Sequence, residues 1–186
     1  MEVLKDVSSI IASISITIGA IVGILQLVKF VKSTKADHER KQKQSTLEFS
    51  HTTWMETRDL LKKMREAGII DGDVPLDDTV KVIINNDGLE DVVSRYLNLM
   101  NRLSVGVITK VYDITIYNQI AGRSGTNIYD SLEPYIKYKR HKIKRGATLW
   151  CDFEQMIDEI KILNGITKSN PAILEHSPLT IGKKKK

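Results

Sequence analysis

The stretch VSSIIASISITIGAIVGILQLV, residues 7–28, decides how this chain is organised. It contains no Asp, Glu, Lys or Arg, and most of it is Ile, Val, Leu, Ala and Gly. A helix of this length is about 33 Å long, and the hydrocarbon core of a bilayer is about 30 Å thick. The sequence therefore predicts a transmembrane helix over residues 7–28, preceded by a short extracytoplasmic N-terminus, residues 1–6.

Two other interpretations of residues 7–28 are weaker. A buried core helix of this length and apolarity is hard to enclose in a chain of 186 residues. A cleaved signal peptide has a basic start and a small-residue cleavage site. Here Glu2, Lys5 and Asp6 nearly cancel, and no Ala-x-Ala pattern follows the apolar stretch.

The charges that flank the predicted span indicate its orientation. Lys5 is the only basic residue before it, whereas several follow it closely: Lys29, Lys32, Lys35, Arg40, Lys41 and Lys43. The positive-inside rule then predicts an inner-membrane protein with its N-terminus outside and residues 29–186 in the cytoplasm. The single cysteine, Cys151, rules out an intramolecular disulfide and fits a reducing compartment.

The rest of the chain has helical patterns and no paired strands. Residues 29–46 are polar and free of Pro and Gly, which predicts a basic helical linker, either continuous with the span or hinged before a new helix. Residues 47–165 are predicted to form an all-α cytoplasmic domain, and residues 166–186 a flexible basic tail. The helices expected in the domain cover residues 47–67, about 77–88, 89 to about 108, 114–121, 127–141 with an interruption or kink at Pro134, and 147–163.

Helix ends and core positions follow from local signals. Gly68, Gly122 and Gly165 are expected stop positions, and Asp77 or Asp78 an N-cap. Apolar residues at helical spacing predict the core. Its expected centre comprises Trp54, Leu99, Leu103, Tyr135 and Trp150.

Motifs for catalysis and ligand binding are absent from the sequence. It has no Gly-rich phosphate loop, no Gly-x-Ser-x-Gly, no His-Glu-x-x-His and no cysteine pair. The four histidines lie in separate segments, and Cys151 is expected to be a packed thiol. We therefore expect a protein that is not an enzyme, with no catalytic, cofactor-binding or metal-binding residue.

The densest charged feature lies between residues 137 and 145 and is interleaved with tyrosines. RNA and an anionic lipid surface are the two contacts that such a cluster favours, and a solvated helix end is the alternative. The residues expected to make the contact are Lys137, Lys139, Arg140, Lys142, Lys144 and Arg145, with His141 among them.

Small residues in the predicted span are spaced for helix association. Ser15, Gly19 and Gly23 recur every four residues, so they share one face and allow two helix backbones to approach closely. Self-association would make the protein a homo-oligomer. In an assembly of several copies, Ser9, Ser13 and Thr17 would line a weakly polar interior through which ions can pass.

Several segments resemble known proteins. The span, YLNLMNRLSVGVITKVYD (residues 96–113), IYNQIAG and EPYIKYKRHK together resemble an uncharacterised bacterial family of membrane-anchored helical domains, over roughly residues 47–163. In size, span position and helical class, the layout also resembles the single-span accessory proteins of type VI-B CRISPR systems. That resemblance implies a divergent HEPN-like domain, a membrane ring, and antiphage defence by permeabilising the inner membrane.

The HEPN ribonuclease motif itself is missing, since no Arg is followed by His four to six residues later, and Arg140 and His141 are adjacent. The expected function is a membrane-anchored, non-enzymatic effector that oligomerises and permeabilises the membrane. Its partners would be the lipid bilayer, further copies, and an RNA-guided ribonuclease or other defence protein. The alternative is a tether that recruits a protein or RNA without forming a pore. A membrane-tethered ribonuclease ranks last.

Overall fold

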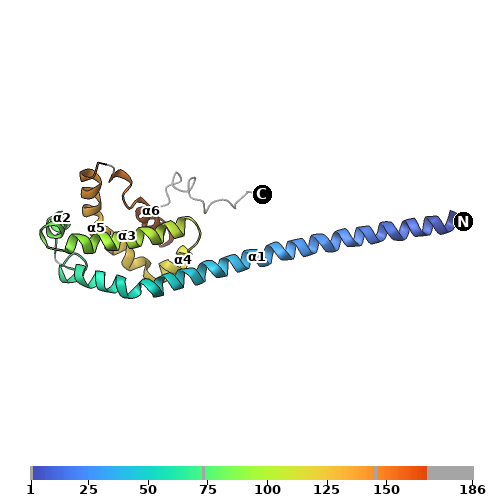
Figure 1. Cartoon of the computed structure of the whole chain (residues 1–186), viewed down its shortest axis with the longest axis horizontal. Helices are drawn as coiled ribbons and strands as arrows, with labels where there is room; N and C mark the ends of the chain where they lie inside the picture. The colour runs from blue at the N-terminus through green and yellow to red at the C-terminus, as the bar shows by residue number, and fades with distance from the viewer. Residues whose placement is uncertain (1, 73, 145, 167–186) are drawn as a thin grey trace. The chain divides into compact units, whose positions relative to one another are not determined.

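The computed structural model describes residues 2–72, 74–144 and 146–166, with side chains described at residue 19 and from residue 21 onward in those ranges. Within these residues the fold is all-α and contains no strand, which confirms the all-α part of the prediction. The elements are α1 (Glu2–Glu66), α2 (Leu76–Asn85), α3 (Leu89–Ile108), α4 (Ile114–Tyr117), the π-helix η1 (Asn118–Gly122), α5 (Arg123–Lys142), the 3₁₀ turn η2 (Gly146–Thr148) and α6 (Cys151–Leu163) (Figure 1).

The chain divides into two units, Met1–Lys41 and Gln42–Lys186, which are described separately. The residues of the predicted linker, 29–46, are all helical and belong to α1. Among the described residues, no helix is both long and apolar enough to cross a membrane. The predicted span, residues 7–28, lies mostly outside the residues whose side chains are described.

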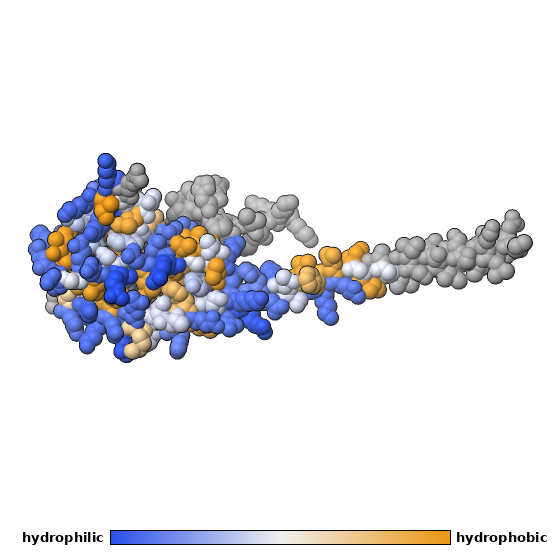
Figure 2. All heavy atoms as spheres, viewed as in Figure 1, coloured by the Kyte–Doolittle hydropathy of each residue, from blue (hydrophilic) through white to orange (hydrophobic). Residues whose placement is uncertain are grey.

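The first unit exposes large apolar side chains on α1. They appear as orange surface on this part of the helix in Figure 2, and they are Ile21, Val22, Ile24, Leu25, Leu27, Val28, Phe30 and Val31. Leu27 is 66% exposed and Phe30 is 71% exposed.

In the second unit, two helices end at glycines, as the sequence predicts. Gly68 adopts a left-handed conformation (φ 72°) just after α1, where the amides of Gly68 and Ile69 bond to the carbonyls of Arg65 and Met64. Gly165 (φ 68°) ends α6 with the same pair of bonds. This Schellman pattern satisfies carbonyls that the helix leaves free, and glycine adopts the conformation without a steric cost.

The core of the second unit lies between paired helices. Helix α3 packs along α6, and α2 packs along α5. Of the expected core residues, Leu99, Leu103, Tyr135 and Trp150 are buried. Trp150 also donates a hydrogen bond from Nε1 to Oδ1 of Asn98 (2.8 Å), so its one polar group is satisfied inside the core.

The prediction that Trp54 belongs to the core is wrong, because its side chain is 59% exposed. Helix α1 contacts the core through Leu60 and Met64, with Phe49 partly buried beside them. Trp54 is five residues after Phe49, about 140° further around a helix, and therefore lies on a different face.

Several predicted boundaries also differ from the structure. Helix α2 begins at Leu76 without a side-chain cap, and Asp77 and Asp78 lie in its first turn instead, where carboxylates favour the helix dipole. Gly122 does not end a helix, because the π-helix continues directly into α5 at residue 123 rather than 127. Pro134 lies within α5 without interrupting it, and the last helix begins at Cys151 rather than 147.

Gly106 provides a test of how α3 is packed. A Cβ at this buried position would clash with Cδ2 of Tyr112, whose ring packs against Phe49 with centroids 5.2 Å apart. Replacing Gly106 by alanine stabilises the helix itself by up to about 1 kcal/mol, because alanine has the higher helix propensity. Forcing the added methyl group against the Tyr112 ring costs about 1–3 kcal/mol, so the net effect on stability is unfavourable. We expect a lower thermal unfolding midpoint of the full-length protein, measured by near-ultraviolet circular dichroism. A raised midpoint would show that the Tyr112 ring moves aside freely.

Candidate functional site

The π-helix η1 separates two cavities of the second unit. Single turns of π-helix are rare and are frequently found at functional sites. Asp113 begins this segment by accepting hydrogen bonds from the amides of Thr115 (2.8 Å) and Ile116 (3.3 Å). Ile120 and Ala121 then line an apolar groove, and Asn118 lines a polar pocket.

The apolar groove runs between α1 and the elements α3, η1 and α5, and its volume is about 270 Å³. Its walls are mainly aromatic and aliphatic, with a few hydroxyl groups, as is typical of sites for small molecules. The groove is lined by Phe49, Ser50, Thr53, Trp54, Thr57, Leu61 and Arg65 from α1, by Tyr96, Met100 and Leu103 from α3, and by Tyr117, Ile120, Ala121, Ser124, Gly125 and Ile128.

Two tyrosine hydroxyls are the main polar groups among the buried residues of this groove. Tyr117 donates a weak hydrogen bond to the sulfur of Met100 (3.7 Å). Tyr96 is 2% exposed, and its hydroxyl has no hydrogen-bond partner among the described residues. Burial raises the pKa of Tyr117 to about 12 and raises the pKa of Tyr96 well above its usual value, so both hydroxyls remain protonated donors.

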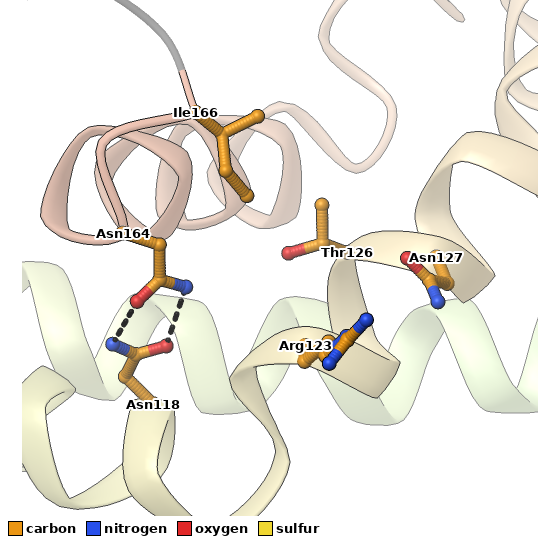
Figure 3. Close-up of a pocket in the computed structure, with 6 residues that line it drawn as sticks. All are labelled: Asn118, Arg123, Thr126, Asn127, Asn164 and Ile166. Atoms are coloured by element: carbon orange, nitrogen blue, oxygen red, sulfur yellow. Dashed lines mark hydrogen bonds between the residues drawn. The ribbon is translucent and has the colours of Figure 1, made fainter.

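The polar pocket lies on the other side of η1 and has a volume of about 420 Å³ (Figure 3). The side-chain amides of Asn118 and Asn164 exchange two hydrogen bonds, of 2.9 and 3.1 Å, which tie η1 to the end of α6. Arg123, Thr126, Asn127 and Ile166 complete its lining. Amide, hydroxyl and guanidinium groups can bind a ligand here, but none of them is an efficient general base.

The predicted basic contact cluster is partly used inside the protein. Lys139 pairs with Glu90, which raises the pKa of Lys139 and lowers that of Glu90. Arg140 is 18% exposed and donates to Glu154 (2.7 Å) and to the carbonyl of Leu149 (2.8 Å). Both residues thus link α5 to neighbouring elements.

The other residues of the cluster are distributed along the end of α5 and the turn after it. Lys137 forms a surface ion pair with Glu133 (3.0 Å). Lys142 donates to the hydroxyl of Tyr138 (2.7 Å), and Lys144 and His141 are exposed. Arg145 lies outside the described residues. Contact with RNA or lipid through these positions remains a prediction.

The predicted packing residues of the span are described only in part. Ser9, Ser13, Ser15 and Thr17 lie outside the residues with described side chains. Among the described residues, a Cβ placed on Gly19 or Gly23 would meet no atom within 4 Å apart from the backbone of its own helix, which leaves room for a neighbouring helix.

In the part of the chain that the structure describes, no group of three or more His, Cys, Asp and Glu residues is placed to hold a metal ion. Cys151 is half-buried at the start of α6, and its thiol lies 3.5 Å from the carbonyl of Ala147.

Comparison with protein families identifies this chain as a member of one of them. Residues 13–160 match the family described as "Domain of unknown function (DUF4760)", and because the match covers most of the chain, the protein belongs to that family. No curated protein and no solved structure matches the chain. Nothing in these comparisons links it to the CRISPR accessory proteins.

The sequence did not reveal the groove. Its lining residues come from segments that are far apart in the chain, and Tyr96 and Tyr117 look like ordinary core aromatics in a helical pattern. The only local signal was Trp54, an aromatic residue off the face of α1 that Leu60 and Met64 define.

Proposed function

We propose that this chain is a single-pass inner-membrane protein, with residues 7–28 as its span and its helical unit in the cytoplasm. The observation that carries the proposal is the uncharged stretch of residues 7–28, whose described end, together with Phe30 and Val31, exposes large apolar side chains on α1. Contiguous exposed apolar surface is unfavourable in water by about 25 cal/mol per Å², and lipid would cover it.

The charges after the span support the same orientation. Lys29, Lys32 and Lys35 are exposed on α1 directly after the apolar stretch, whereas Lys5 is the only basic residue before it. Basic residues next to a span are retained on the cytoplasmic side, where they lie close to anionic headgroups.

We further propose that the protein acts as a non-enzymatic effector whose spans associate and permeabilise the membrane. The open backbone at Gly19 and Gly23 supports close packing between spans, since small residues at this spacing let helices approach. Because the sequence layout resembles that of type VI-B CRISPR accessory proteins, we extend the proposal to antiphage defence.

The mass of the full-length protein in mild detergent, corrected for bound detergent, tests the effector proposal. A discrete assembly of about six or more copies that conducts ions in a planar bilayer would support a pore. A monomer or dimer without conductance would contradict it.

Replacing both Gly19 and Gly23 by leucine is expected to dissociate the assembly, because the larger side chains hold the helix backbones apart. Ile21→Leu with Ile24→Leu is the matched control, since it keeps the apolarity and bulk of neighbouring positions. The masses of the two variants in detergent provide the comparison. An assembly that survives in the glycine variant would contradict span packing through this face.

A second candidate function is a membrane tether that recruits a partner. The apolar groove, with the exposed Trp54 on its wall, is the observation that favours it. A tether would be monomeric or dimeric in detergent, would conduct no ions, and would retain its partner in the variant with leucine at positions 19 and 23.

A further inference from the structure

The polar pocket beside η1 has room for a small molecule. Its volume of about 420 Å³ lies within the range of about 300–1,000 Å³ that is usual for ligand sites. An adjoining hollow of about 380 Å³ shares Asn118, Arg123 and Asn127 with it. These three side chains therefore line one continuous polar region along η1 and the start of α5 (Figure 3).

The lining of both hollows contains positive charge and no negative charge. Arg123 is the basic residue in each, and neither lining includes Asp or Glu. The guanidinium of Arg123 is exposed and has no ion pair or hydrogen bond among the described residues. Four other arginines of the second unit pair with carboxylates, namely Arg58, Arg65, Arg95 and Arg140. The five donor hydrogens of Arg123 are thus available to a ligand.

The neighbouring amides add further donors. Asn118 and Asn164 exchange two hydrogen bonds, which leaves each of them one more amide hydrogen. The side-chain amide of Asn127 has no partner among the described residues. Thr126 donates its hydroxyl hydrogen to the carbonyl of Gly122 (2.8 Å). The pocket is therefore richer in donors than in acceptors, and its one charge is positive, which favours an anionic ligand.

The position of Asn118 is fixed before any ligand binds. A Cβ at the buried Gly122 would clash with Oδ1 of Asn118, so the asparagine side chain occupies space that glycine leaves free. The two hydrogen bonds with Asn164 then tie this side chain to the end of α6 (Figure 3). A donor that is already held in place lowers the entropic cost of binding.

We infer that this pocket binds a small molecule through an oxyanion, a phosphate or carboxylate group, with Arg123 as the charged contact and the asparagine amides as further donors. A planar guanidinium suits both groups, because it donates two parallel hydrogen bonds to two oxygens. The pocket is larger than either group alone, so the rest of the ligand would lie beside Thr126 and Ile166. This inference concerns the second unit alone, and it holds whether or not the spans assemble.

Phenylglyoxal, which modifies accessible guanidinium groups, tests the inference on the full-length protein in amphipol. Inorganic phosphate and acetate are the probes, and sodium chloride at the same ionic strength is the reference. We expect at least one of the two anions to slow the modification of Arg123 several-fold, as mapped by mass spectrometry. Protection by phosphate alone would identify a phosphate group, and protection by acetate alone a carboxylate.

Arg102 is the internal reference for this measurement. It is exposed on α3, lines neither hollow, and has no partner among the described residues. Its rate of modification should be the same in phosphate, acetate and chloride, because nothing around it resembles the pocket of Arg123.

Asn127→Asp makes the test specific. It removes amide donors and places a carboxylate four residues after Arg123, within reach of the guanidinium on the same helix. We expect at least about tenfold more anion to be needed for the same relative protection of Arg123. Asn85→Asp, at an exposed position of α2 outside both hollows, makes the same change of charge and should behave like the wild type.

Three results would overturn the inference. One is a failure of both anions to protect Arg123 over millimolar concentrations. Another is equal slowing at Arg123 and Arg102, which would reveal a general effect of the ions. The third is equal protection of Arg123 in Asn127→Asp and Asn85→Asp, because the anion would then bind outside this pocket.

Discussion

Replacing Ile16 and Ile18 by aspartate is expected to release the full-length protein from the membrane. Both residues lie at the middle of the predicted span, residues 7–28. On insertion scales an aspartate at the centre of a helix costs about 2.5–3.5 kcal/mol, whereas an isoleucine contributes roughly −0.3 to −0.6 kcal/mol. The two changes together therefore cost roughly 6–8 kcal/mol, which is enough to prevent insertion.

The matched control is Ile16→Leu with Ile18→Leu, which keeps the stretch apolar. Cell membranes are collected by ultracentrifugation, and the fraction of protein in the pellet is measured for each variant. We expect the leucine variant in the pellet and the aspartate variant in the supernatant. If the wild type and the aspartate variant distribute equally, residues 7–28 do not insert.

The second large effect is expected at Trp150. Its side chain is 6% exposed, stacks on Tyr135 and donates to Asn98. Trp150→Ala removes a large buried ring, which costs about 3–5 kcal/mol, and leaves the Asn98 amide oxygen without its partner. For a chain of this size the thermal midpoint is expected to fall by roughly 10 °C or more.

Trp54→Ala is the natural comparison, because the sequence alone assigns both tryptophans to the core. An exposed side chain away from special features usually changes stability by about 0.5 kcal/mol or less, so the midpoint should move by only a degree or two. Near-ultraviolet circular dichroism during heating measures both variants. Equal losses at Trp54 and Trp150 would contradict the placement of Trp54 outside the core.

Helix positions were the most predictable part of the structure. The stripe that includes Leu99 and Leu103 indicated a helix from Leu89, and α3 begins there. Gly68 and Gly165 end their helices because glycine adopts left-handed backbone angles at no steric cost. Gly122 failed as a stop because its own φ is −57°, an ordinary helical value, and the helix continues.

Tertiary assignments were harder to predict. The residues of the basic cluster are adjacent in sequence, but Lys139 and Arg140 pair with Glu90 and Glu154, which lie on two other helices, α3 and α6. The groove forms between α1, α3 and the π-helix, so the residue pattern of any single segment does not predict it.

Alkaline carbonate extraction of membranes that contain the full-length protein tests the central claim most directly. High pH removes proteins that bind a membrane through charge, whereas a helix inserted across the hydrocarbon core stays with the lipid. The membrane proposal predicts that the protein remains in the lipid pellet after extraction. Complete release into the supernatant would contradict a transmembrane helix over residues 7–28.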